Sequence, residues 1–177
     1  MERTGIVFSG SGGQGVITAA IILAEAAVVH EGLYAIQAQS YGPEARGGAT
    51  RSDVIISDSV IHFPKVVFPN YLVTLTQEAY NKYNSMIVPG GTIITDKRYV
   101  TPRRNSDAIQ KEYNIYDSVV EHIGNPVVVN VCMLGIVIQL TKIVKPESVI
   151  KTLKNRMNSK FLEINEKALM LGIKMAE

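Results

Sequence analysis

The chain has 177 residues, of which 46% are hydrophobic and 19% are charged, and this composition excludes a disordered chain. Lysine and arginine number 18 and aspartate and glutamate 16, and the surplus of 18 − 16 = +2 gives no reason to expect a nucleic-acid surface. A single cysteine, Cys132, cannot supply an internal disulfide, a structural zinc site or an iron–sulfur cluster. We therefore expect one folded domain over residues 1–177 that holds no metal.

Two apolar stretches, residues 19–29 and 127–138, are interrupted by Glu25 and Asn130. Both are shorter than the ~20 apolar residues of a membrane span. The N-terminal residues also lack the basic start and apolar stretch of a signal peptide. These features predict a cytoplasmic protein that does not contact a membrane.

Strands and helices are predicted to alternate along the first half of the chain. Such alternation is typical of a mostly parallel sheet with helices on both faces. We therefore predict a single-domain α/β fold with a Rossmann-like start and a helical C-terminal section. The predicted strands are residues 5–9, 33–37, 53–57, 71–76 and 92–95, and the predicted helices are residues 16–30, 77–85, 127–144 and two further segments after Pro146.

The predicted helix at residues 16–30 is apolar nearly all round, and Gly32 follows it as a C-cap. A helix on a protein surface should have a polar face. We expect this helix to be buried on two sides, against the sheet and against a partner. An isolated chain would then expose an apolar helix face, which predicts a homodimer.

A glycine-rich turn joins the first predicted strand to this helix. Such a turn lets the backbone approach a ligand closely, and the free N–H groups at the helix N-terminus favour an anion such as phosphate. The alternative is a tight turn whose glycines serve only close packing. The candidate ligand-binding residues are Gly10, Ser11, Gly12, Gly13, Gln14 and Gly15.

Two features separate this turn from familiar nucleotide sites. The second predicted strand ends in residues 35–39 without the carboxylate that binds the ribose of NAD. No Gly-Lys-Ser/Thr follows the turn, so it is not a P-loop.

A second glycine-rich loop follows the second predicted strand. In a parallel sheet it lies at the same carboxyl edge as the first loop, where ligands of open α/β sheets bind. The guanidinium of Arg46 can bind phosphate or carboxylate. The alternative is a solvated loop in which Glu44 pairs with Arg46. The candidate residues are Tyr41, Gly42, Pro43, Glu44, Arg46 and Gly47.

Together, Ser9-Gly10-Ser11-Gly12-Gly13-Gln14-Gly15 and Tyr41-Gly42-Pro43-Glu44-Ala45-Arg46-Gly47-Gly48 resemble the gamma subunit of 2-oxoacid:ferredoxin oxidoreductases. This subunit is equivalent to one domain of single-chain pyruvate:ferredoxin oxidoreductase. The resemblance covers nearly the whole chain and extends to Pro89-Gly90-Gly91-Thr92 and Asn130-Val131-Cys132-Met133-Leu134-Gly135. It is greatest with the 2-oxoglutarate branch.

The resemblance implies a complex that decarboxylates a 2-oxoacid on thiamine diphosphate, passes electrons through iron–sulfur clusters to ferredoxin, and transfers the acyl group to coenzyme A. It implies alpha, beta and ferredoxin-like delta subunits as partners, and these would carry the thiamine and the clusters. This chain would support assembly and bind coenzyme A through Gly12–Gly15 and Arg46, without a catalytic residue and inactive in isolation. The alternatives are a stand-alone nucleotide- or phosphate-binding α/β protein, or the gamma subunit of a pyruvate or branched-chain enzyme.

Overall fold

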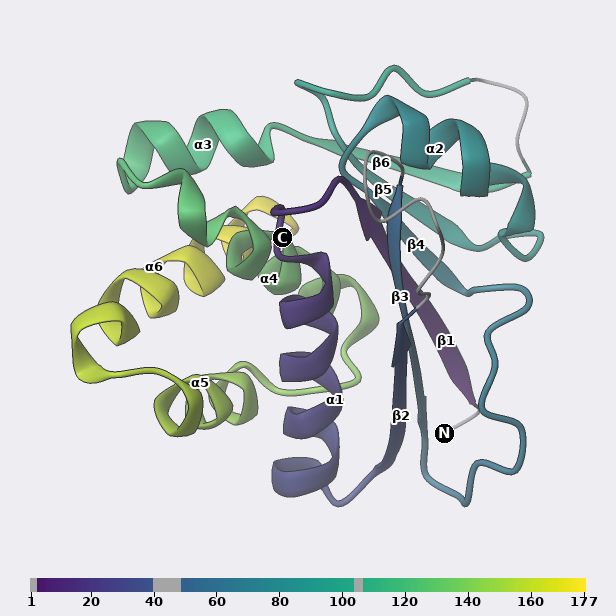
Figure 1. Cartoon of the computed structure of the whole chain (residues 1–177), viewed down its shortest axis with the longest axis horizontal. Helices are drawn as coiled ribbons and strands as arrows, with labels where there is room; N and C mark the ends of the chain where they lie inside the picture. Colours follow the sequence, from purple (N-terminus) through teal and green to yellow (C-terminus); the bar gives the residue numbers. More distant parts are fainter. Residues whose placement is uncertain (1–2, 40–48, 104–106) are drawn as a thin grey trace.

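The computed structural model describes residues 3–39, 49–103 and 107–177. Their strands form one six-stranded sheet in the order β2-β3-β1-β4-β5-β6 (Figure 1). The strands are β1 (Thr4–Gly10), β2 (Tyr34–Gln39), β3 (Thr50–Ser57), β4 (Tyr71–Thr74), β5 (Thr92–Asp96) and β6 (Ile109–Tyr113). The helices are α1 (Val16–Glu31), α2 (Gln77–Tyr83), α3 (Ile115–His122), α4 (Val129–Thr141), α5 (Pro146–Arg156) and α6 (Ser159–Met175), with short 3₁₀ helices η2 (Asn84–Met86) and η3 (Pro126–Val128).

The sheet is mostly parallel, as predicted, but β3 runs against its neighbours. The pairs β1–β4, β4–β5 and β5–β6 are parallel, whereas β3 is antiparallel to both β1 and β2. Only residues 40–49 separate β2 from β3, and a parallel pair requires a crossover of a dozen or more residues. Because β1 and β2 each pair antiparallel with β3, they run in the same direction.

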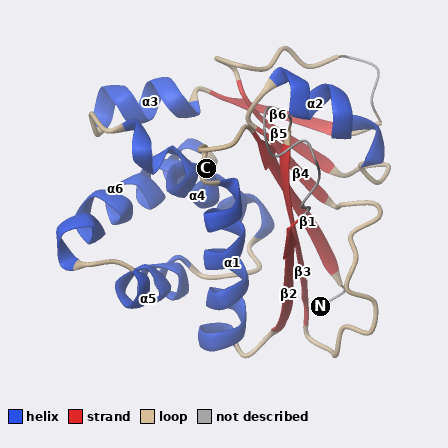
Figure 2. Cartoon of the chain, in the orientation of Figure 1, coloured by secondary structure: helices blue, strands red, loops and turns tan. Residues whose placement is uncertain are grey.

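Helices cover the two faces of the sheet unequally (Figure 2). Helix α1 lies on one face, and α4, α5 and α6 belong to the same helical layer, so that a large core forms between sheet and helices. On the other face, α2 and the connection at residues 58–70 cover a smaller core that includes Val7, Tyr80 and Val66. The predicted α/β fold with helices on both faces is therefore confirmed.

The apolar surface of α1 is covered by the chain's own helices. Besides strands β1, β2 and β3, α1 contacts α4 and α5. Of its large apolar side chains, Val28 and Val29 near the C-terminal end are exposed. The prediction of burial on two sides holds, but its second side does not require another molecule, and this helix gives no ground for a homodimer. Gly32 ends α1 with a left-handed φ of 67° and an N–H bond to the carbonyl of Ala27, as the C-cap prediction requires.

Strand β6 and helix α3 were not predicted from the sequence. Strand β6 reads Ile-Gln-Lys-Glu-Tyr, and it forms the outer edge of the sheet, where polar side chains face solvent. Helix α3 is short, and its buried residues are Ile115 and Val119. The segment expected as one helix from residue 127 begins as the 3₁₀ turn η3, and α4 proper starts at Val129. No helix of the described ranges is both long and apolar enough to span a membrane.

Candidate functional site

The first glycine loop lies where the sequence predicts it, between the end of β1 at Gly10 and the start of α1 at Val16. The N–H of Gln14 donates to the carbonyl of Ser11 at 3.3 Å, and the Gln14 side-chain Oε1 accepts from the N–H of Ser11 at 2.7 Å. The amide Nε2 of Gln14 donates to the carbonyl of Leu75, just after β4, at 3.4 Å. Gln14 therefore shapes the loop and ties it to the sheet, and its polar groups are engaged within the chain.

Three of the loop glycines are explained by the fold itself. Gly13 and Gly15 have left-handed φ angles of 88° and 71°, which favour glycine. A Cβ on Gly15 would also lie 2.5 Å from Nδ2 of Asn130, whose amide donates to the carbonyl of Gly15 at 3.3 Å. A Cβ on Gly10 would overlap the side-chain oxygen of Gln14.

Gly12 has no such explanation. A Cβ added there meets nothing within 4 Å, and its φ lies outside the left-handed region. Among the glycines of the described ranges, it alone combines open space with an ordinary φ. No described residue therefore accounts for glycine at this position, and the backbone here is open to close approach by another group.

The loop has the electrostatic character of an anion site. Ser11, Gly12 and Gly13 are exposed, and no described residue accepts a hydrogen bond from the N–H of Gly12 or Gly13. The first turn of α1 carries no acidic side chain. Within the described residues, the first turn of α1 therefore offers no carboxylate to neutralise the positive end of the helix dipole.

Asn130 contacts the glycine loop although it was not among the site residues predicted from the sequence. It comes from α4, far along the chain, and its side chain supports the loop from beneath. The available signal was its position as a polar interruption in an otherwise apolar segment.

The second predicted loop lies outside the described residues. Its candidates Tyr41, Gly42, Pro43, Glu44, Arg46 and Gly47 therefore remain predictions. The strands on either side are described: Gln39 and Phe8 both pair with Ser52, and Gly10 pairs with Thr50. The end of β2 and the start of β3 thus flank the carboxyl end of β1, from which the first loop leaves.

Other candidate groups have structural roles. Cys132 is fully buried in α4, and burial raises the pKa of its thiol to about 12. Of the basic cluster near residues 97–104, Arg98 pairs with Asp117 at 2.5 Å and lies over the ring of Tyr116. Arg104 lies outside the described ranges. Within those ranges, no group of three or more histidine, cysteine or acidic residues could hold a metal ion.

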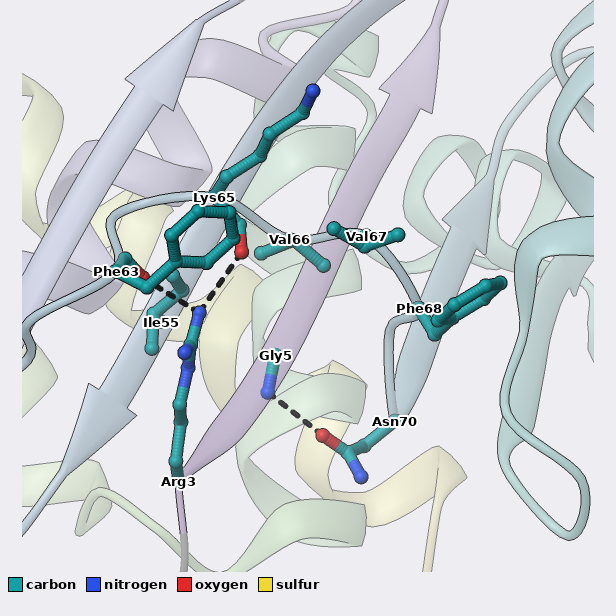
Figure 3. A pocket seen from close by; sticks show the side chains of 9 residues that line it. All are labelled: Arg3, Gly5, Ile55, Phe63, Lys65, Val66, Val67, Phe68 and Asn70. Carbon is teal, nitrogen blue, oxygen red and sulfur yellow. Dashed lines mark hydrogen bonds between the residues drawn. The ribbon is translucent and has the colours of Figure 1, made fainter.

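A cavity of about 260 Å³ lies at the opposite end of β1 (Figure 3). Arg3 and Gly5 line it together with residues from the connection at 58–70, such as Phe63 and Lys65. Because it lies at the amino end of β1, it is separate from the glycine loop.

The fold and the loop together define a class of protein. Residues 5–175 match the family described as pyruvate ferredoxin/flavodoxin oxidoreductase, and the chain belongs to this family.

Individual relatives match over almost their whole length. The chain is 41% identical to the 2-oxoglutarate synthase subunit KorC of Methanocaldococcus jannaschii over 177 residues, which cover 99% of this chain and 95% of the relative. The keto/oxoacid ferredoxin oxidoreductase gamma subunit of Geobacter sulfurreducens superposes with a TM-score of 0.88, at 39% identity and 98% coverage of both chains.

The same fold also occurs inside a longer chain. The 2-oxoglutarate:ferredoxin oxidoreductase of Magnetococcus marinus superposes with a TM-score of 0.86 at 19% identity. The match covers 99% of this chain and 31% of that one, so the likeness is one of fold.

Proposed function

We propose that the chain is the gamma subunit of a multi-subunit 2-oxoglutarate:ferredoxin oxidoreductase. This enzyme oxidatively decarboxylates the 2-oxoacid to an acyl-CoA and CO₂ and passes the electrons to ferredoxin. The observation that carries the proposal is the 41% identity with the KorC subunit over nearly the whole of both chains. It favours 2-oxoglutarate over pyruvate or a branched-chain oxoacid. Alpha, beta and ferredoxin-like delta subunits would carry the thiamine diphosphate and the iron–sulfur clusters.

Anaerobic affinity purification of the tagged chain from its own cells tests this proposal. The co-eluting chains are identified, thiamine diphosphate and iron are measured, and electron transfer to ferredoxin is assayed with 2-oxoglutarate and with pyruvate. Co-elution of cofactor-bearing subunits and turnover of 2-oxoglutarate are expected. Turnover of pyruvate alone would correct the substrate, whereas a lone chain without cofactors would overturn the subunit role.

Within this complex, we propose that the glycine loop binds a phosphate of coenzyme A. Three observations on the described residues support this role: the open position of Gly12, the N–H groups of Gly12 and Gly13 that no described residue accepts, and the lack of an acidic side chain in the first turn of α1. Arg46 is proposed as a second phosphate ligand on the strength of the family resemblance.

Kinetics of the assembled complex test the coenzyme A role. Gly12→Val places a branched side chain where a ligand would approach, so the KM for coenzyme A should rise about tenfold or more, a loss of about 1.4 kcal/mol, while the KM for 2-oxoglutarate stays unchanged. Thr18→Val is the matched control, because Thr18 is exposed on α1 beyond the loop and receives the same side chain. Unchanged coenzyme A kinetics in Gly12→Val would remove the loop from the coenzyme site. Binding of ATP or NAD to the isolated chain would favour the stand-alone nucleotide-binding alternative.

A further inference from the structure

The connection between β3 and β4, residues 58–70, exposes an unusual amount of apolar surface. Val60, Phe63, Val67 and Phe68 have exposed fractions of 56%, 54%, 45% and 65%. Their clustering in one connection distinguishes them from single exposed apolar residues, which are normal on a protein surface. An apolar group of this kind is typical of a surface that contacts another protein.

This connection has no regular secondary structure, yet it is held in a defined shape. The guanidinium of Arg3 donates to the carbonyls of Phe63 and Lys65 at 2.7 and 2.9 Å (Figure 3). Arg51 donates to the carbonyl of Val66 at 2.9 Å. At its end, Asn70 donates its N–H to the carbonyl of Gly5 at 2.8 Å and accepts the N–H of Gly5 on Oδ1 at 2.8 Å.

These bonds have a consequence for association. A surface whose backbone is already fixed loses less conformational entropy when a partner binds. The exposed side chains Phe63 and Phe68 are therefore presented from a preorganised support.

The charged side chains that line the cavity of Figure 3 are positive, and the one carboxylate of the connection, Asp58, does not line it. Arg3 and Lys65 are the only charged residues among the nine that line the cavity of Figure 3. Lys65 also lines a neighbouring cavity of about 480 Å³. Asp53 is the one acidic residue that lines this second cavity, and it is already paired with Arg51 at 2.6 Å. A partner that covers this surface would therefore bring carboxylates opposite Arg3 and Lys65.

We propose that the connection at residues 58–70 is the surface on which another subunit of the oxidoreductase docks, with apolar side chains against Phe63 and Phe68 and carboxylates against Arg3 and Lys65. The proposal rests on the proposed role as a subunit. A second copy of the chain is a poorer occupant, because a two-fold contact through this surface would bring the Arg3 and Lys65 of both copies together.

The test uses the complex purified through a tag on this chain. Phe63→Ser combined with Phe68→Ser should lower the amount of co-eluting subunits per tagged chain at least about tenfold. Lys65→Glu should lower it less, with a loss that grows at low salt, because the reversed charge then repels carboxylates over a longer distance. Phe161→Ser is the matched control, since Phe161 is 51% exposed on α6.

Two further measurements distinguish a lost docking contact from a misfolded variant. Circular dichroism of each variant establishes that the free chain is folded. Hydrogen exchange of the wild-type chain should show amides of residues 58–70 protected in the complex relative to the free chain.

The outcomes are distinguishable. Normal co-elution of the Phe63→Ser/Phe68→Ser variant, or unchanged exchange in residues 58–70, would overturn the docking surface while leaving the subunit role intact. Failure of the wild-type chain to retain any cofactor-bearing subunit would overturn both. A native mass spectrum that shows a homodimer lost in the double variant, with the other subunits retained, would assign the surface to a second copy and overturn the proposed occupant.

Discussion

Glycines serve opposite purposes in the helical layer and in the loop at the carboxyl edge of the sheet. Where α4 crosses α6, the Cα atoms of Gly135 and Gly172 approach closely, and a Cβ on Gly172 would overlap the carbonyl of Cys132. In the loop, by contrast, a Cβ on Gly12 would meet nothing. The packing of α4 against α6 requires Gly135 and Gly172, whereas no described residue requires a glycine at position 12.

Gly15 stands between these two cases. It belongs to the loop, but its left-handed φ and its contact with Asn130 tie it to the helical layer. Glycines that the fold requires therefore differ from Gly12, for which we propose a binding role, and substitution can test this difference.

The largest expected effect is that of Gly172→Ala. The new Cβ would overlap the backbone of α4, so the two helices must separate, and we expect a loss of about 3 kcal/mol in the free energy of unfolding. Chemical denaturation of the isolated chain measures it. Met170→Ala on the exposed face of the same helix is the control and should change stability by no more than about 0.5 kcal/mol. Equal stabilities of the two variants would show that α4 and α6 do not need this close approach.

Gly15→Ala should have the next largest effect. An alanine at a left-handed φ costs about 1 kcal/mol, and the clash with Asn130 raises the total to about 2 kcal/mol. Gly32→Ala separates the two contributions, because Gly32 shares the left-handed φ but has no atom within 4 Å of an added Cβ. If thermal denaturation shows equal losses for both variants, Asn130 exerts no steric constraint on the loop.

The side chain of Glu31, at the end of α1, forms a pH-dependent contact with the start of α5. Its Oε1 accepts hydrogen bonds from the N–H of Lys145 at 2.9 Å and the hydroxyl of Ser148 at 2.7 Å. Partial burial raises the pKa of Glu31, but these bonds and the charge of Lys145 outweigh it, and the pKa lies below the ordinary 4.5. The contribution is therefore present above pH 4.5 and is lost as the pH falls through the lowered pKa.

The corresponding variant is Glu31→Gln. At neutral pH we expect it to be less stable than the wild type by under about 1 kcal/mol. The difference should shrink as the pH falls below 4.5, and denaturation curves at a series of pH values would record it. A difference that does not vary with pH would contradict a role for the ionised carboxylate.

The smallest expected effect on stability is that of Gly12→Val. Because an added Cβ meets no neighbour, the free energy of unfolding of the isolated chain should stay within about 0.5 kcal/mol of the wild type. Thermal denaturation checks this value. A loss as large as that of Gly15→Ala would show that Gly12 also serves the fold, and a kinetic defect of the variant would then no longer indicate a ligand.

The sequence by itself determined the local structure. Short β-branched runs and longer apolar segments predicted β1, α1 and most later elements, because such patterns are set by neighbours along the chain. The glycine spacing likewise placed a loop between β1 and α1, and with the second loop it indicated the family that the comparisons confirm.

Only the tertiary structure decided what joins residues far apart in the chain. The reversed direction of β3, the cover of α1 by α4 and α5, and the support of Gly15 by Asn130 all depend on such contacts. Local pattern carries no information about them, since an apolar helix face is the same whether a partner or another helix of the chain covers it. For the same reason the sequence does not distinguish Gly12 from Gly15. The structure does, because a Cβ on Gly15 would overlap Asn130, whereas a Cβ on Gly12 would meet nothing and leaves that position open to a ligand.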